Sequence, residues 1–132
     1  YGNGVLFCGD TLFGAGCGRL FEGTPTQMYA SLQQLATLPG ATAVYCAHEY
    51  TEHNLAFALS LQPKHQTLLT RQRTTKNLRS QGLPSLPSTI SLELATNPFL
   101  RCHEAGLIAA SGSSSPEPVQ VFAAIREMRN HF

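Results

Sequence analysis

The chain has 132 residues, 42% of them hydrophobic, so it has the length of one ordinary domain and enough apolar side chains to bury a core. The formal net charge is +1 and only 13% of the residues are charged, which gives no general attraction for nucleic acid or an acidic membrane surface. Without such a general attraction, a specific function must come from a site. No run is long and apolar enough to cross a bilayer.

The first half of the chain predicts a strand, a helix and a second strand. Residues 5–8 are a short apolar run bounded by glycines, which is typical of a strand buried on both faces. Thr24, with proline next and glutamine three residues on, predicts the capped start of a helix that ends at Pro39. Residues 43–47 form a second apolar run. Such a crossover makes the two strands parallel, so their carboxyl ends lie at the same edge of a sheet.

Asp10 and His48 stand just beyond the ends of these two strands. They are 38 positions apart, yet the topology brings them to one edge, where sites of α/β sheets usually form. An aspartate after a strand often only accepts hydrogen bonds in a turn. A histidine at the same edge favours a metal site, because a carboxylate can bridge two cations and imidazole is a common zinc or iron ligand. A catalytic metal needs about three protein ligands, so two are not enough. The other histidines do not complete the set, because we interpret them as surface residues: His53, His65, His103 and His131.

A glycine-rich segment, residues 14–23, separates Asp10 from the first helix. Its four glycines favour neither a regular helix nor a strand, so we expect a tight loop folded around Asp10. A phosphate-binding loop is disfavoured, because no lysine followed by serine or threonine ends the segment and the helix begins too late. Arg19 in this segment and Tyr50 after the second strand could meet an anionic substrate at the edge.

The cysteines are widely spaced and include no Cys-x-x-Cys pair: Cys8, Cys17, Cys46 and Cys102. We expect buried free thiols in a reducing cytoplasm rather than disulfides. A catalytic pair of Cys17 and His48 is the rival to a metal site, although the sequence supplies no third residue to orient it.

The second half of the chain predicts helices. The first begins with Thr51 as its cap, ends at Pro63 and turns inward Leu55, Phe57, Ala58 and Leu59. Residues 64–81 form a partly exposed helix with a basic face, which we interpret as solvated, with an anion-binding patch as the alternative: Arg71, Arg73, Lys76 and Arg79. A short helix over residues 88–95 and a mobile surface loop over residues 111–116 follow.

The last helix is expected to begin at Pro118. Its predicted apolar side consists of Val119, Phe122, Ile125, Met128 and Phe132. Arg126 and Arg129 are three positions apart and share a face of this helix. They form either a solvated face or, if the helix packs back across the sheet edge, contacts for an anionic substrate.

The sequence offers too few strands for a complete sheet. Only two are convincing, and a two-stranded sheet is marginal alone. The chain also opens on residues 1–4, which look like the turn before a strand. We therefore expect the chain to be the second part of a larger domain.

Three stretches carry a specific resemblance to a known family: residues 7–24, 46–51 and 97–101. In order and spacing they resemble glyoxalase II, the hydroxyacylglutathione hydrolase of the metallo-β-lactamase superfamily, and the likeness runs to Phe132, most weakly in the final helix. The resemblance implies an α/β fold. Residues 1–61 would be the incomplete last part of a four-layer αββα sandwich, and residues 62–132 a helical glutathione-binding domain.

The resemblance also implies a site with two divalent metals. Asp10 would bridge them and His48 would ligate one, with zinc favoured and iron or manganese as alternatives. Metal-bound hydroxide would attack the thioester of S-D-lactoylglutathione and release D-lactate and glutathione, a cytoplasmic step of methylglyoxal detoxification. The implied substrate contacts are Arg19, Tyr50, Arg126 and Arg129.

The sequence departs from the family pattern in two ways. Phe21 stands where many members have a tyrosine, which puts one hydroxyl contact in doubt. The superfamily's Thr-His-x-His-x-Asp-His signature and a further histidine before Asp10 are absent. We therefore expect the chain alone to be inactive and to need the missing N-terminal part. The alternatives are a non-catalytic glutathione-binding fragment and another thioesterase or a sulfur dioxygenase of the superfamily.

Overall fold

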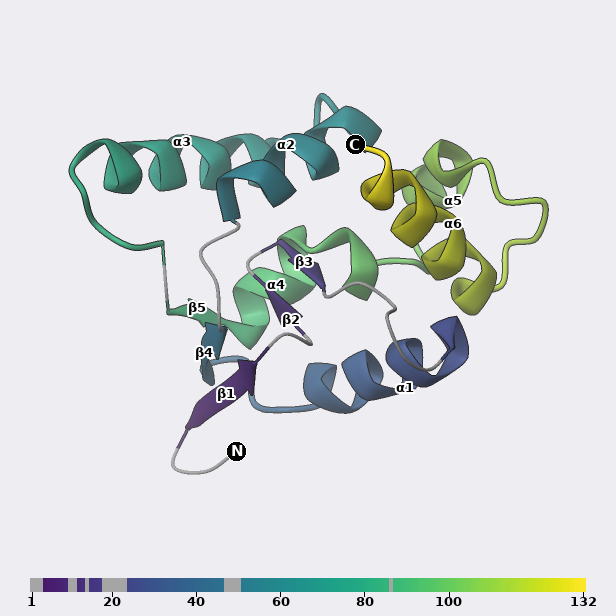
Figure 1. Ribbon diagram of the computed structural model, residues 1–132, viewed down its shortest axis with the longest axis horizontal. Helices are drawn as coiled ribbons and strands as arrows, with labels where there is room; N and C mark the ends of the chain where they lie inside the picture. Colours follow the sequence, from purple (N-terminus) through teal and green to yellow (C-terminus); the bar gives the residue numbers. More distant parts are fainter. Residues whose placement is uncertain (1–3, 10–11, 14, 18–23, 47–50, 86) are drawn as a thin grey trace.

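The computed structural model describes residues 4–9, 12–13, 15–17, 24–46, 51–85 and 87–132. Across these residues the protein is mixed α/β, mostly helical with a small sheet (Figure 1). In Figure 1 the helices α2 (Thr51–Leu61) and α3 (Gln66–Ser80) lie on one side and α1 (Pro25–Ala36) on the other. The short helix α4 (Ile90–Thr96) lies between them.

The sheet of the described residues has three strands in the order β1-β4-β5. Strands β1 (Val5–Gly9) and β4 (Ala43–Cys46) pair in parallel, as the strand, helix, strand pattern predicts. The sequence did not predict β5 (Ser88–Thr89), which pairs antiparallel with β4 where we expected the start of a helix. Two residues carry too little periodicity to indicate a strand, so only the tertiary pairing with β4 identifies it.

The start of the glycine-rich segment belongs to a regular element that the sequence did not predict. Strands β2 (Leu12–Phe13) and β3 (Gly16–Cys17) pair antiparallel as a small hairpin. The turn between them includes Ala15, a non-glycine residue with φ of 60°, in the left-handed region. The segment is therefore not only an irregular loop.

Helix α1 confirms the expected capping box. The Thr24 hydroxyl accepts from the Gln27 N–H at 3.2 Å, and the Gln27 side chain accepts from the Thr24 N–H at 2.9 Å. Leu32 is fully buried, and the other three residues of its predicted inner face pack partly buried against the core: Met28, Leu35 and Ala36. The capping box and the spacing of the apolar residues indicate the same helix, which is why the sequence predicted this element.

The remaining helices follow the sequence with three corrections. Thr51 is the first residue of α2 rather than its cap. Helix α5 (Ala105–Ser111) was not predicted, and η1 (Pro98–Leu100) follows α4 directly. Helix α6 (Pro118–Asn130) buries Val121 instead of turning Met128 inward, since Met128 is 39% exposed.

The main hydrophobic cluster joins the two predicted domains. It includes Leu6 and Val44 from the sheet, Phe57 from α2, and Phe99 and Phe122 from η1 and α6. The boundary at residue 61 stays a prediction, because this cluster takes residues from both sides of it. Among the described residues, no helix is long and apolar enough to span a membrane.

Candidate functional site

The ends of β1 and β4 lie together, as the parallel pairing requires. Gly9, the last residue of β1, is registered with Cys46, the last residue of β4. Asp10 follows Gly9 in sequence and His48 is two positions after Cys46. Both candidate ligands are outside the described residues, as are the candidate contacts Arg19 and Tyr50 and the departure at Phe21. Within the described part of the chain, no group of three or more His, Cys, Asp or Glu side chains could hold a metal ion.

Three consecutive hairpin residues are held by side chains from the helical part. The Ala15 N–H donates to Glu93 Oε1 at 2.9 Å. Asn97 Nδ2 donates to the Gly16 carbonyl at 2.9 Å, and Arg126 Nη1 donates to the Cys17 carbonyl at 2.7 Å. We call these three side chains the hairpin clamp. Because all three are buried, their hydrogen bonds are shielded from competition with water.

Arg126 points into the protein, contrary to the solvated face considered for it. Its side chain is only 3% exposed, and its guanidinium carbon lies 5.3 Å from the centroid of the Phe99 ring. Its Nη1 atom also lies 3.6 Å from the Cys17 sulfur. The predicted contact between Arg126 and substrate stays a prediction, and every described contact of this residue is internal.

The thiol of Cys17 has the environment of a packing residue. Its side chain is 6% exposed, and burial raises its pKa to about 11, although the nearby Arg126 acts in the opposite direction. A nucleophilic cysteine needs a lowered pKa, since the thiolate is the reactive form. This raised pKa argues against the rival catalytic pair with His48.

Cys102 is a second buried free thiol. Burial raises its pKa to about 12. The expectation of free buried thiols is therefore confirmed for Cys17 and Cys102, whereas the side chains of Cys8 and Cys46 are outside the described ones.

Gly16 permits a close approach between the hairpin and α2. A Cβ atom at position 16 would lie 2.6 Å from Asn54 Nδ2, so any larger residue would push the Asn54 amide away. The Asn54 side chain in turn accepts from Arg129 Nε at 3.1 Å. Arg129 is half-buried, so it joins α6 to the helix that lies against the hairpin.

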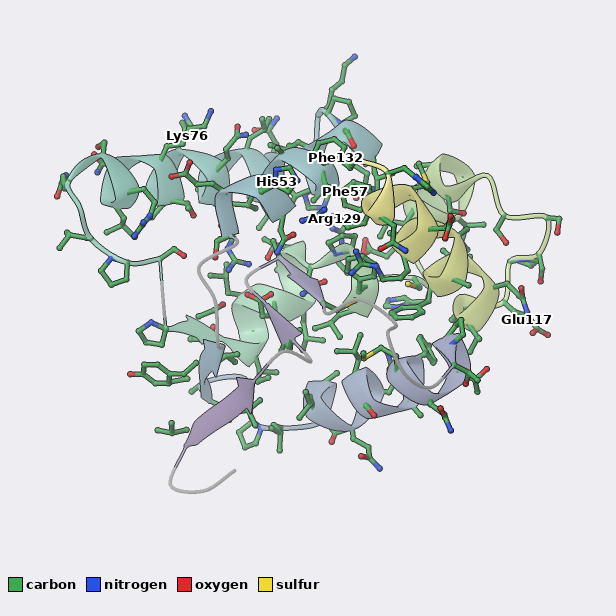
Figure 2. The ribbon with its side chains drawn as sticks, in the orientation of Figure 1. His53, Phe57, Lys76, Glu117, Arg129 and Phe132 are labelled. Carbon is green, nitrogen blue, oxygen red and sulfur yellow. The ribbon has the colours of Figure 1, made fainter. Side chains whose placement is uncertain are left out.

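Phe132, which follows α6, packs against two rings of α2 (Figure 2). The ring of Phe132 lies 5.3 Å from that of Phe57 and 5.3 Å from that of His53. Arg129 lies next to these rings in the same view. Phe132 therefore packs on α2 while remaining 50% exposed, which is a partial agreement with its predicted inward orientation.

Most of the histidines interpreted as surface residues are confirmed as such. His53, His103 and His131 are exposed, and His131 Nε2 lies 2.8 Å from Glu127 Oε1. His65 differs, because it is half-buried and caps α3 by accepting from the Leu68 N–H at 3.3 Å. Its burial lowers its pKa.

Comparison with known proteins identifies the family. Residues 49–132 match the family model described as "Hydroxyacylglutathione hydrolase C-terminus". The chain belongs to the hydroxyacylglutathione hydrolase family. A protein of Methylobacillus flagellatus named "Hydroxyacylglutathione hydrolase" is 75% identical over 132 residues, which are 100% of this chain and 53% of that protein. One of Dechloromonas aromatica with the same name is 52% identical, over 100% of this chain and 56% of its own length. The chain therefore spans about half the length of these curated relatives.

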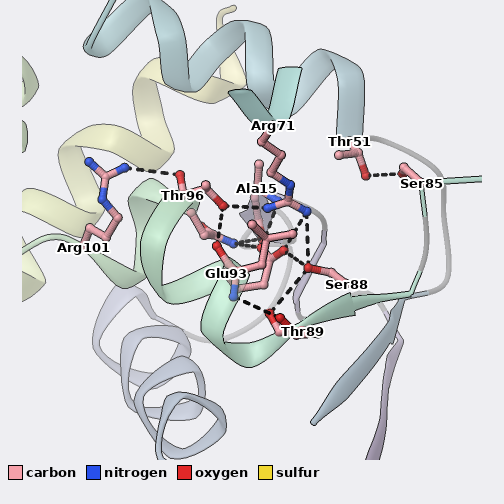
Figure 3. Close-up of polar contacts among 12 residues, drawn as sticks. Ala15, Thr51, Arg71, Ser85, Ser88, Thr89, Glu93, Thr96 and Arg101 are labelled. Carbon is pink, nitrogen blue, oxygen red and sulfur yellow. Dashed lines mark hydrogen bonds and ion pairs between the residues drawn. The ribbon is translucent and has the colours of Figure 1, made fainter. Parts of the chain in front are cut away.

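A buried ion pair anchors the clamp of this hydroxyacylglutathione hydrolase family member (Figure 3). Arg71 Nη2 lies 2.8 Å from Glu93 Oε2, and their side chains are 5% and 0% exposed. The Ser88 hydroxyl donates to the same carboxylate oxygen, while Asn97 Nδ2 donates to Oε1 at 3.0 Å. Arg71 Nη1 also donates to the Thr96 hydroxyl at 2.7 Å.

The interpretation of Arg71 as a solvated charge is therefore wrong, whereas Arg73, Lys76 and Arg79 are exposed as expected.

Sequence reasoning missed Glu93 and singled out Asn97 only within the family-like stretch at residues 97–101. Glu93 had a weak signal, because it lies within a short apolar helix where a solvated carboxylate would be unusual. Ser88 and Asn97 are near it in sequence, but its partner Ala15 is 78 residues away and its partner Arg71 lies on α3, so no local pattern could identify these two contacts.

Proposed function

We propose that this chain is the carboxy-terminal half of a metal-dependent thioester hydrolase. The enzyme would cleave S-D-lactoylglutathione to D-lactate and glutathione, in methylglyoxal detoxification. The observation that carries the proposal is the 75% identity, over the whole chain, to a protein named hydroxyacylglutathione hydrolase. The missing amino-terminal half would complete an αββα sandwich around the small sheet and supply the remaining metal ligands.

The pairing of the strand ends supports a role for Asp10 and His48 in holding metal. Gly9 and Cys46 are registered, and an aspartate and a histidine follow them within two positions. A bridging carboxylate and a neutral imidazole suit zinc, with iron or manganese as alternatives. Two bound divalent ions would supply an activated water and polarise the thioester carbonyl.

The residues of this chain would bind and orient the glutathione part of the substrate. We assign a direct contact with a glutathione carboxylate to Arg129, because it is half-buried at the end of α6 and its Nε is oriented by Asn54. Arg19 and Tyr50 would contribute further contacts at the sheet edge. The burial of Arg126 favours Arg129 over Arg126 for this direct contact.

The cellular setting follows from the same chemistry. The buried thiols of Cys17 and Cys102 are free, which is typical of a reducing compartment. We propose that the enzyme is cytoplasmic, where glutathione conjugates would be available to it.

The proposed activity can be tested by restoring the missing half. This chain is joined behind the amino-terminal region of the Methylobacillus flagellatus relative that it does not cover, which we call the joined protein. We expect the joined protein to bind about two metal ions and to hydrolyse S-D-lactoylglutathione, and the 132-residue chain alone to do neither. Thioester absorbance and metal analysis measure both. Hydrolysis at full rate by the chain alone, or none by a folded, metal-loaded joined protein, would refute the proposal.

Arg129→Gln tests the proposed glutathione contact. In the joined protein we expect KM to rise by about 10- to 150-fold with kcat nearly unchanged, because a charge-assisted hydrogen bond of about 1.5–3 kcal/mol is lost in ground and transition states alike. Arg73→Gln removes an exposed arginine of α3 and serves as the control. A KM equal to that of the control variant would count against the assignment.

The family match of residues 49–132 to a carboxy-terminal model favours one further possibility, a glutathione-binding chain without catalysis. Titration of the 132-residue chain with glutathione distinguishes it. Binding that Arg129→Gln weakens, together with an inactive joined protein, would support the binding function over the enzyme.

A further inference from the structure

Asn54 of α2 lies between the hairpin and the end of α6. Its side chain is buried, with an exposed fraction of 4%, and its Oδ1 atom accepts from Arg129 Nε at 3.1 Å. The same amide group faces Gly16 of β3. One buried side chain therefore contacts both a backbone position of the hairpin and the arginine that we assign to glutathione binding.

The whole amide group of Asn54 rests on Gly16. A Cβ atom at position 16 would lie 2.6 Å from Nδ2, 2.7 Å from Cγ and 3.0 Å from Oδ1, which leaves no room for a methyl group. The glycines with positive φ in the described part of the chain are Gly4, Gly82 and Gly112. Backbone conformation therefore does not require glycine at position 16, whereas the packing of the Asn54 amide does.

The backbone at Arg129 is also held against α2. The Phe132 N–H donates to the Arg129 carbonyl at 3.3 Å, and the Phe132 ring lies 5.3 Å from the ring of Phe57. Figure 2 shows Phe57, Phe132 and His53 beside Arg129. Phe132 thus anchors the last turn of α6, and Asn54 fixes the Arg129 side chain at Nε.

We propose that Asn54 is a positioning residue that orients the Arg129 guanidinium toward glutathione, and that Gly16 is required because it leaves room for the Asn54 amide. This inference rests on the proposed function. The bond from Nε to Asn54 assigns the glutathione carboxylate to the two terminal nitrogens of Arg129. These nitrogens form the planar fork that suits a carboxylate.

The benefit of this arrangement is conformational entropy. An arginine side chain has many rotamers, and immobilising such a side chain on binding weakens affinity by about 2- to 13-fold, the equivalent of about 0.5–1.5 kcal/mol. Asn54 restricts the rotamers of Arg129 when the protein folds, before glutathione arrives. We therefore expect the loss of Asn54 to weaken the binding of the glutathione part and to leave the reacting atoms undisturbed.

The first test measures hydrolysis by the joined protein. Asn54→Ala and Gly16→Ala should each raise KM for S-D-lactoylglutathione by about 2- to 13-fold with kcat nearly unchanged. Gly16→Ala removes no polar atom, so it tests the same contact if Asn54→Ala fails to fold. An unchanged KM in the folded variants would overturn the proposal.

Two double variants identify the route of the effect. Asn54→Ala should raise KM no further when Arg129→Gln is already present, because Asn54 acts through Arg129. Gly16→Ala should raise KM no further in the Asn54→Ala background, because the added methyl group then meets no amide. A full effect of the second change in either double variant would overturn the proposal.

Gly106→Ala is the matched control for a methyl group placed against a side-chain amide. A Cβ atom at position 106 would lie 2.8 Å from Nε2 of Gln62, the residue that follows α2. The Gln62 side chain accepts from Arg101. We expect KM of Gly106→Ala to equal that of the parent joined protein. An equal rise in this control would mean that any disturbance beside α2 raises KM, and would overturn the proposal.

The second test uses the 132-residue chain and needs no activity. NMR measures the exchange of the Arg129 Nε hydrogen with water, and the signal is assigned by its absence in Arg129→Gln. Exchange should be at least about tenfold faster in Asn54→Ala and Gly16→Ala, the factor that corresponds to a charge-assisted hydrogen bond of about 1.5 kcal/mol. Exchange at the parent rate in both variants would overturn the proposal. If the parent joined protein is inactive, the proposed function fails, while this exchange still decides whether Asn54 and Gly16 hold Arg129.

Discussion

Replacing Arg71 by methionine should lower the free energy of unfolding by about 3–5 kcal/mol, because it leaves the carboxylate of Glu93 buried without its cation. Glu93 is 0% exposed and cannot recover solvation by rotating outward. Whole domains are stable by only about 5–15 kcal/mol, so the loss is a large part of the total. Urea unfolding followed by circular dichroism measures it as a lower midpoint at an unchanged slope.

The double variant Arg71→Met with Glu93→Gln is the control that identifies the cause. A neutral glutamine can still accept from the Ala15 N–H through its oxygen and no longer needs a cation. We therefore expect the double variant to be more stable than Arg71→Met alone. The ion pair is not the anchor that its geometry indicates if Arg71→Met lowers the free energy of unfolding by less than about 1 kcal/mol. The same conclusion follows if the loss in the double variant equals the sum of the losses in the two single variants.

The parallel strand pair and the first helix were predictable, because their signals are local. A continuous apolar run indicated β1 and β4, and Thr24 with Gln27 indicated the capping box of α1. The adjacency of the two strand ends then followed from topology alone. This is why Asp10 and His48 could be predicted to lie at one edge without any side-chain information.

The clamp could not be predicted, because each of its bonds joins residues far apart in the chain. Arg126 is 109 positions from Cys17, and Glu93 is 78 from Ala15. On its own helix Arg126 forms a basic pair with Arg129, and a basic pair on a helix is most often solvated. Only the packing of α6 against the hairpin distinguishes the buried arginine from the half-buried one.

The apolar face of α6 was predicted only approximately for a similar reason. The chosen positions began at Val119, whereas the buried residues are Val121, Phe122, Ile125 and the charged Arg126. A buried arginine does not enter a hydrophobic pattern, so the predicted apolar side shifted around the helix toward Met128. The face is set by what the helix contacts, and one of those contacts is a backbone carbonyl.

Replacing Phe122 by alanine should therefore cost about 3–5 kcal/mol, one of the largest losses available on α6. The ring is 0% exposed and meets Tyr29 of α1 and Phe99 of η1 edge to face, with centroids at 5.9 and 5.6 Å. Phe99 also carries the Arg126 guanidinium over its ring. Removing Phe122 would leave a cavity between α1, η1 and α6 beside the residue that holds the hairpin.

Met128→Ala on the same helix separates burial from sequence periodicity. Met128 is 39% exposed, so we expect its truncation to change stability by no more than about 0.5 kcal/mol. Thermal unfolding of the two variants under identical conditions compares them directly. Equal losses would mean that α6 turns the face predicted from the sequence inward, with Met128 in the core. A large loss only at Phe122 would support the packing that buries Arg126 against the hairpin.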